Sequence, residues 1–125
     1  MKAAKFHPNS STIQKGRSLM VIMTLRLTVP PEKTVEAIEI IKSMTGPISA
    51  EPDCKQVSLY SDINNDDALM LVEEWGSQKA LQEHIRSDDF RIVLEVMELS
   101  VRAPEICFNT ISERAGFDLV ERMRS

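Results

Sequence analysis

Residues 55–75 read KQVSLYSDINNDDALMLVEEW. In the first half, Val57 and Leu59 alternate with polar or aromatic side chains, which is the period of a strand with one buried face. Asn64 to Asp67 have the composition of a turn, and a largely apolar run from Ala68 to Trp75 follows them. Because so short a turn joins neighbouring antiparallel strands, the stretch predicts a β-hairpin.

A strand and a helix are expected before this hairpin. Leu19 to Val29 begins as a continuous apolar run and ends in alternation, which predicts a central strand. Two prolines and a glutamate at 30–32 then favour a helix start. The apolar residues from Val35 to Met44 share one broad stripe, so we expect an amphipathic helix that stops at Gly46-Pro47.

Two helices and a strand are expected after the hairpin. Ser77 is placed to cap a helix over 78–86, and Ser87 to cap a second that runs to about Leu99. Residues 105–111 favour a fourth strand, and Ser112 opens a short tail helix. The order β-α-β-β-α(α)-β predicts an α+β fold: a ferredoxin-like split βαβ arrangement whose four-stranded antiparallel sheet carries helices on one face.

The chain divides into three predicted parts. Residues 1–18 form a polar N-terminal arm with four basic residues and no acidic one. Residues 19–111 form the ferredoxin-like domain, and residues 112–125 form a C-terminal helical tail. With 125 residues in all, the chain has the length of one domain.

Composition argues against several classes of function. The formal charge of −4 and the isoelectric point near 5.2 disfavour nucleic-acid binding, which needs a basic face. No apolar run is long enough to span a membrane, and no apolar segment of a secretory signal follows the basic start. Two cysteines are too few for a disulfide framework. We therefore expect a cytoplasmic protein with two reduced thiols and no membrane contact.

The second face of the sheet predicts a partner. Residues of both parities in the two central strands are largely apolar, as Leu69, Met70, Leu71 and Val72 show. A sheet face in contact with water is normally polar. We therefore expect the helix-free face to be covered by a second copy of the chain in a homodimer.

Three segments resemble the antibiotic biosynthesis monooxygenase family. Residues 46–54, GPISAEPDC, resemble the bend G-x-x-x-x-E-P-G-C between the first helix and second strand, with Asp53 in place of the usual glycine. Residues 72–75, VEEW, and the pattern S-Q-K-A-L-x-x-H of residues 77–84 resemble the hairpin and second helix. Ser87-x-x-Phe90 extends the likeness, which covers roughly residues 19–111.

This resemblance implies a dimeric α/β barrel with a pocket in each chain between sheet and helices. Some members insert one oxygen atom of O₂ into quinols or polycyclic anthrones with no cofactor, neither metal nor flavin. The resemblance therefore implies a cofactor-independent monooxygenase that acts on a small apolar aromatic substrate, a quinol or phenol. The alternative is a non-catalytic dimeric module that binds a small ligand, since family membership alone does not establish activity.

Two other functions are disfavoured. A related branch of this fold degrades haem, but the place of its axial histidine aligns with Leu94 here. An isomerase acting on a phosphorylated or oxo compound would need an anion site, which the acidic body does not offer.

His84 is the candidate catalytic residue. It shares the apolar side of its helix with Leu81 and Ile85, and a partly buried imidazole can accept a phenolic proton near neutral pH. The alternative is a helix histidine that is hydrogen-bonded into the domain surface. As a base it should be neutral in the resting protein and face a cavity near Trp75. Glu73 and Glu74 point to opposite faces of a strand, so one of them is the carboxylate within reach.

Trp75 and Tyr60 are the candidate substrate contacts. Trp75 would stack on a flat ring, and Tyr60 would donate a phenolic hydrogen bond; the alternatives are a core tryptophan and an exposed strand tyrosine. Cys54 and Cys107 have no C-x-x-C or histidine-containing signature, so inert thiols are expected. No ligand spacing or glycine-rich loop predicts a metal or a nucleotide cofactor.

Overall fold

The computed structural model describes residues 19–125, so the predicted arm at 1–18 lies outside the described residues. Its elements follow one another in the predicted order. They are β1 (Val21–Thr28), the 3₁₀ turn η2 (Pro31–Lys33), α2 (Thr34–Ser49), β2 (Cys54–Asp62), β3 (Asn65–Trp75), α3 (Gln78–Ile85), α4 (Asp88–Met97), β4 (Glu105–Thr110) and α5 (Phe117–Arg124).

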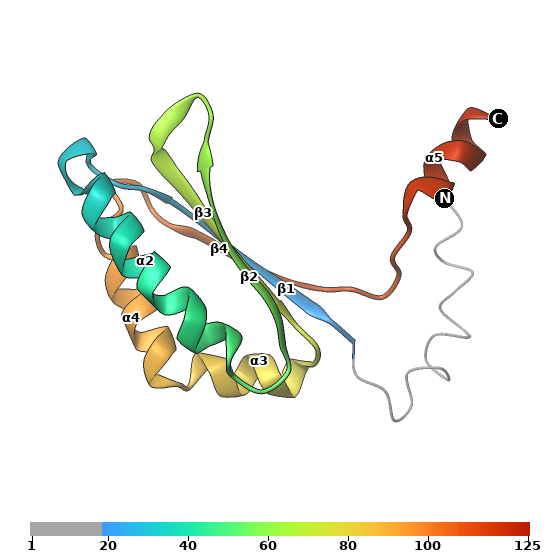
Figure 1. Ribbon diagram of the computed structural model, residues 1–125, viewed down its shortest axis with the longest axis horizontal. Coiled ribbons are helices and arrows are strands. Elements are labelled where there is room, and N and C mark those ends of the chain that lie inside the picture. The colour runs from blue at the N-terminus through green and yellow to red at the C-terminus, as the bar shows by residue number, and fades with distance from the viewer. Residues whose placement is uncertain (1–18) are drawn as a thin grey trace.

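The four strands form one antiparallel sheet in the order β2-β3-β1-β4. Helices α2, α3 and α4 lie against one face of it, and within residues 19–125 the other face carries no helix (Figure 1). The predicted hairpin is the β2–β3 pair, and β1 lies between β3 and β4. This is the ferredoxin-like α+β fold, as predicted.

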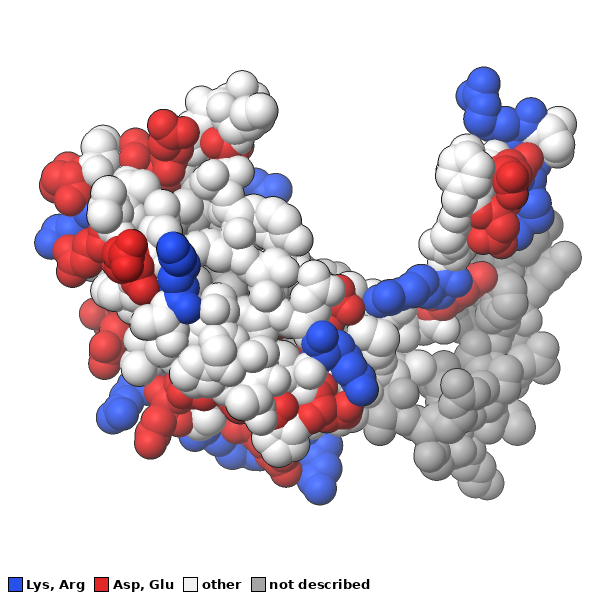
Figure 2. All heavy atoms as spheres, viewed as in Figure 1, with Lys and Arg blue, Asp and Glu red and all other residues white. Residues whose placement is uncertain are grey.

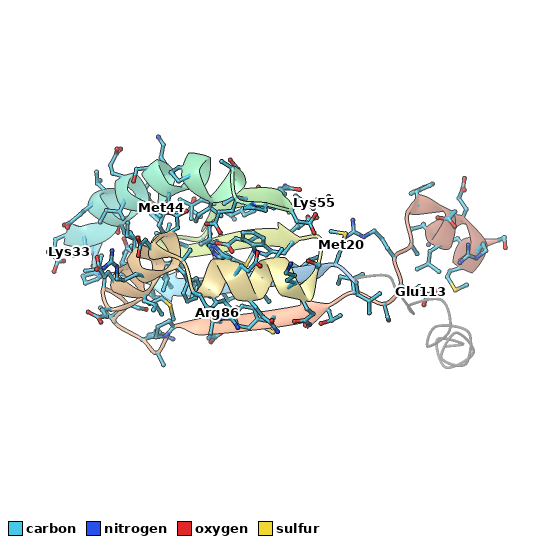
Figure 3. All side chains as sticks on the ribbon, turned by 90° about the horizontal axis from the view of Figure 1, so that it is seen from below. Met20, Lys33, Met44, Lys55, Arg86 and Glu113 are labelled. Atoms are coloured by element: carbon cyan, nitrogen blue, oxygen red, sulfur yellow. The ribbon has the colours of Figure 1, made fainter. Side chains whose placement is uncertain are left out.

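The core fills the layer between sheet and helices. Alternate residues of β1 point into it, and so do the β3 residues opposite them, because strand side chains alternate between faces. The helices contribute the stripe Ala37, Ile41, Met44 and Ile48 of α2 and the buried residues of α3 and α4. Side chains from the sheet and the helices meet in this layer, and α5 lies apart from it (Figure 3).

The two short helices begin where the serines predict. The Ser77 hydroxyl accepts a hydrogen bond from the Ala80 amide at 3.1 Å, and Ser87 accepts one from the Phe90 amide at 3.2 Å. Each serine satisfies an amide that would otherwise have no partner at a helix start. The caps fix where α3 and α4 begin, and therefore which of their residues face the sheet.

The predicted end of the first helix is wrong. Helix α2 continues through Gly46 and Pro47 to Ser49. Pro47 is exposed and costs the last turn one backbone hydrogen bond, whereas Ile48 is 1% exposed and extends the apolar stripe of the helix. Burial of one isoleucine is worth about 1.5–3 kcal/mol. Tertiary packing therefore overrides the local stop signal.

Asp53 occupies the position where the family pattern has glycine. Its φ of 63° lies in the left-handed region, which Asp tolerates better than most residues. The Asp53 carbonyl accepts a hydrogen bond from the Gly76 amide at 2.9 Å, and its carboxylate lies 3.1 Å from Lys55 Nζ. This turn holds the end of α2 next to the end of β3, and it places Glu51 beside α3.

The helix-free face has an apolar centre. Ile22, Met70 and Val72 lie on β1 and β3 and are only partly exposed, although no helix covers them. Arg26, Tyr60 and Glu74 belong to the same face. Beyond β4, helix α5 stands clear of the body, with Phe117 71% and Met123 70% exposed (Figure 1).

Candidate functional site

His84 lies in the core layer. Helix α3 turns Ala80, Leu81 and His84 toward the sheet, and the imidazole is fully buried, whereas Ile85 is 38% exposed. The inward position of His84 agrees with the sequence pattern, but the prediction that Ile85 shares this side of α3 is wrong. His84 needs polar partners in the core layer, because burying a polar group without them costs free energy.

Two glutamates supply those partners. His84 Nδ1 lies 3.0 Å from both carboxylate oxygens of Glu51, in the loop between α2 and β2. His84 Nε2 lies 3.0 Å from Oε1 of Glu73 on β3. We call these three residues the Glu73–His84–Glu51 cluster. Glu73 is the inward member of the two adjacent glutamates and is fully buried.

The contact at Nε2 is an ion pair without hydrogen-bond alignment. Although Nε2 and Oε1 are close, the direction of approach leaves His84 Nε2 without a hydrogen bond, and Glu73 Oε2 also has none among the described residues. Glu73 Oε1 accepts a hydrogen bond from the Trp75 indole at 3.0 Å. Glu73 Oε2 is therefore a buried acceptor whose lone pairs have no donor among the described residues.

Aromatic rings hold the imidazole. Trp75 stacks on it with ring centroids 4.4 Å apart and an interplanar angle of 27°, and Phe90 meets it edge to face at 5.4 Å. The face of an indole attracts a cationic ring, so this stacking favours the imidazolium form. Trp75 is itself fully buried and serves as a wall of the cluster.

The environment raises the pKa of His84. Burial alone would lower it, but the interaction with Glu73, and then the hydrogen bonding and charge of Glu51, outweigh burial and raise the pKa above 6.5. Burial and the neighbouring Asp89 raise the pKa of Glu51 to about 6, against the opposing effect of His84. The prediction of a neutral resting imidazole is therefore not supported at neutral pH, because two carboxylates face the ring.

These shifts predict an unusual pH dependence of stability. Both groups have raised pKa values in the folded protein, so both bind protons more tightly when folded. Glu51 contributes stability that is complete below pH 4.5 and is lost as the pH rises through about 6. The contribution of His84 is complete below pH 6.5 and is lost as the pH rises through its raised folded value.

We therefore expect the free energy of unfolding to fall from pH 5 to pH 8.5. Urea denaturation across this range measures it, and the variant Glu51→Gln should show a shallower slope. A stability that rises steadily with pH would contradict the protonation states assigned to the cluster.

A small apolar cavity lies on the same side of the sheet. Its volume is about 10 Å³, roughly one water molecule, and its lining includes Leu25, Ile48, Val57 and Leu71. Val57 is the cross-strand neighbour of Glu73, and Leu71 precedes Glu73 by two residues on the same face. Neither Glu73 nor His84 lines any of the cavities found in residues 19–125, so the prediction that His84 faces a cavity is wrong for this structure.

Tyr60 does not meet His84 in this fold. It lies on the helix-free face, half exposed, and lines a groove of about 310 Å³ with Arg26, Met70 and Arg102. Trp75 and His84 lie on the opposite face. Within one chain the structure thus brings Trp75 to His84 and separates Tyr60 from both.

The outer end of the cluster reaches the surface. The Glu51 side chain is 16% exposed and borders a pocket of about 360 Å³ that also includes Glu83, Asp88 and Asp89. On the face shown in Figure 2, basic side chains are scattered among acidic ones and form no continuous patch. Because Glu51 is the one residue of the cluster whose side chain reaches the surface, it is the member that can exchange protons with water.

Other chemistry finds less support. Burial, and then the charge of Glu73, raise the pKa of the Cys54 thiol to about 11, which disfavours the reactive thiolate. Within residues 19–125 no group of three or more His, Cys, Asp or Glu side chains is arranged to hold a metal ion. No helix in that range is long and apolar enough to cross a membrane.

The sequence predicts that Glu73 or Glu74 supplies a carboxylate to His84, and the structure shows that it is Glu73. The contact of Glu51 with His84 was not predicted. The signal for Glu73 is its spacing: it stands two residues before Trp75, so both point to one face. The signal for Glu51 is its place in the E-P-x-C bend. Neither spacing shows that both carboxylates meet the same imidazole.

The fold and the site together define a class of protein: a ferredoxin-like domain with a charged cluster between its sheet and its helices. Residues 20–95 match the model of the antibiotic biosynthesis monooxygenase family, and the chain belongs to that family.

Two relatives are similar to this chain over most of its length. An uncharacterized protein of Synechocystis sp. is 26% identical over 107 residues, which cover 85% of this chain and 73% of that protein. The crystal structure of a conserved protein from Methanosarcina mazei Go1 is 29% identical with a TM-score of 0.68, covering 74% of this chain and 92% of that one.

A neighbour with a named activity shares the fold at lower identity. SnoaB, a cofactor-independent oxygenase from Streptomyces nogalater, matches with a TM-score of 0.66 at 14% identity, over 76% of this chain and 95% of that chain. These neighbours match over about three-quarters of this chain.

Proposed function

We propose that the protein is a cofactor-independent monooxygenase that oxidises a quinol or another phenolic or polycyclic aromatic substrate with O₂. The observation that carries this proposal is the buried Glu73–His84–Glu51 cluster, which lies on the same side of the sheet as an apolar cavity. A deprotonated quinol is a strong one-electron reductant, so a site that removes its proton and excludes water prepares it to reduce O₂ directly. Membership of the monooxygenase family supports the same reaction class.

The reaction balances without an added reductant. For 1,4-naphthohydroquinone, one atom of O₂ enters the ring to give the hydroxynaphthoquinone, and the other leaves as water. The substrate supplies the two hydrogens and two electrons that form this water. The protein contributes desolvation, orientation and proton transfer, with His84 as the predicted catalytic group and Trp75 as the ring beside it.

A substrate can enter only if the layer between sheet and helices opens. The cavity holds about one water molecule, which is far smaller than an aromatic ring system. The alternative function, a dimeric module that binds a small apolar ligand without chemistry, requires the same opening. Tyr60 remains a predicted substrate contact that would act from the groove on the helix-free face.

We also propose a homodimer, in which the helix-free faces of two chains pack together to form the α/β barrel. The apolar centre formed by Ile22, Met70 and Val72 supports it, since such a surface rarely faces water. A stable interface would bury about 1,600 Å² in total. A cytoplasmic location remains part of this proposal.

Oxygen consumption with a panel of naphthoquinols tests the function. We expect turnover by the wild type and a loss of about 10²-fold or more in His84→Gln, the usual contribution of a general base or acid. Glutamine keeps a hydrogen-bonding side chain between the two carboxylates, which His84→Ala does not.

Binding separates the two candidate functions. A wild type that binds the quinols but consumes no O₂ would favour the ligand-binding module. A His84→Gln variant as fast as the wild type, in a folded protein, would remove His84 from the mechanism.

A further inference from the structure

We propose that Glu73, His84 and Glu51 form a proton path from the core to the surface, with Glu73 Oε2 receiving the proton of the substrate. This inference rests on the proposed function and deepens it, because it names the groups that accept, transmit and release the proton. It also assigns a catalytic role to Glu73, which touches the substrate, and a positioning and relay role to Glu51.

The inner end of the path is the unpaired oxygen of Glu73. Oε2 is buried without a hydrogen-bond partner among the described residues, whereas Oε1 accepts the Trp75 indole and lies beside His84. An unsatisfied buried acceptor is costly, and most buried polar atoms are paired. Val57 and Leu71 flank Glu73 and line the apolar cavity, so a substrate that opens the layer at this cavity would bring its phenolic hydroxyl toward this carboxylate.

The middle of the path is an imidazole with a carboxylate at each nitrogen. Nε2 faces Glu73 and Nδ1 faces Glu51, each at 3.0 Å. The rings of Trp75 and Phe90 fix its plane. This orientation gives Nδ1 a hydrogen bond to Glu51 and holds Nε2 beside Glu73 as an ion pair, so protonation of one carboxylate changes the charge seen by the other.

The outer end is Glu51, where the chain of contacts reaches water. It is the partly exposed member of the cluster and borders the pocket that includes Asp89 of α4. Burial and Asp89 raise the pKa of Glu51 to about 6, a value suited to accepting and releasing a proton near neutral pH. The remaining titratable group near the cluster is Cys54 of β2, whose raised pKa keeps it a neutral thiol.

The charge of the Glu73–His84–Glu51 cluster is the same before and after it takes the proton of the substrate. At rest the imidazolium stands between two carboxylates, so the cluster carries one negative charge. The substrate O–H bond breaks as an O–H bond forms on Glu73 Oε2. His84 then loses its Nδ1 proton to Glu51, which releases it to water. One proton has entered and one has left, and the cluster again carries one negative charge beside the substrate anion. The cycle closes when the reduced oxygen atom takes the Glu73 proton as it leaves as water and His84 Nδ1 regains a proton through Glu51.

The kinetic test uses charge-matched pairs and 1,4-naphthohydroquinone as the probe. Glu73→Gln should lower kcat by about 10²-fold or more, the scale of general base catalysis. Its control is Glu74→Gln, the adjacent residue on the opposite face, which should retain kcat. Glu51→Gln should lower kcat with KM unchanged and shift the pH profile of kcat. Its control is Glu83→Gln, which removes a charge from the same surface pocket.

A second measurement needs no substrate. The exchange of the His84 ring protons with water can be followed by nitrogen-15 NMR of the resting protein. If Glu51 carries protons out, exchange at Nδ1 should slow in Glu51→Gln and stay unchanged in Glu83→Gln. If Glu51 only supports the local structure, its replacement should loosen the site and exchange should become faster.

The two measurements separate the failure of the path from the failure of the proposed function. If the wild type oxidises the quinol and Glu73→Gln is as fast as Glu74→Gln, the path is overturned and the function stands. If the wild type oxidises no quinol, the function falls, and the exchange measurement decides the path. Should Glu73→Gln fail to fold, the kcat and exchange of Glu51→Gln decide it: unchanged kcat or faster exchange overturns the proposal.

Discussion

Replacing His84 with alanine should lower the free energy of unfolding by about 3–5 kcal/mol at pH 7, the cost of breaking a buried ion pair. His84 provides the positive charge that faces both Glu73 and Glu51, and Glu73 is fully buried. Without the imidazole, Glu73 must remain charged in an apolar layer or take up a proton. The variant also loses the ring contacts with Trp75 and Phe90.

Urea denaturation of the wild type, His84→Ala and the double variant His84→Ala/Glu73→Gln separates charge from packing. If the uncompensated carboxylate causes most of the loss, Glu73→Gln should recover stability in the His84→Ala background while destabilising the wild type. Such non-additivity is the signature of directly coupled groups. If both substitutions cost the same in either background, the cluster is not energetically coupled. Glu83→Ala, an exposed neighbour on α3, should change stability by less than about 0.5 kcal/mol.

The sequence predicts the fold because the local signals and the tertiary structure agree. Alternation in β2 and β3, the turn at 64–67 and the serine caps of α3 and α4 are all dictated within a few residues. The end of α2 differs because two signals compete there. Pro47 opposes the helix locally, but Ile48 has a place in the core that no local pattern shows.

The site is less predictable because its contacts are long-range. The parity of β3 correctly sends Glu73 and Glu74 to opposite faces, and the pattern of α3 sends His84 inward. Yet His84 meets Glu51 across 33 positions of sequence, and only the turn at Asp53 brings them together. Strand alternation also explains why Tyr60 lies away from the cluster. Val57 is the cross-strand neighbour of Glu73, and Tyr60, three residues further along β2, points to the opposite face.

Replacing Val72 with aspartate should dissociate the proposed homodimer. Val72 lies on the central strand β3, on the helix-free face, between Thr24 of β1 and Ser58 of β2. Burying an unpaired carboxylate in the interface costs several kcal/mol, and Glu74 two residues away on the same face adds repulsion. A cost of about 3–4 kcal/mol weakens association on the order of 10²–10³-fold. Sedimentation at micromolar concentration should then show a shift toward the 14.1 kDa of one chain.

Val72→Thr is the matched control, because threonine has nearly the shape of valine and no charge. It should remain dimeric, which would assign the effect of aspartate to its charge. Val72 points away from the core layer, so Val72→Asp should stay folded and keep the near-ultraviolet signal of Trp75, which is buried on the other face. A wild type that sediments as a single 14.1 kDa species would refute the dimer outright. A dimeric Val72→Asp would mean that the two chains associate through another surface, and the apolar centre around Ile22 and Met70 would then face water.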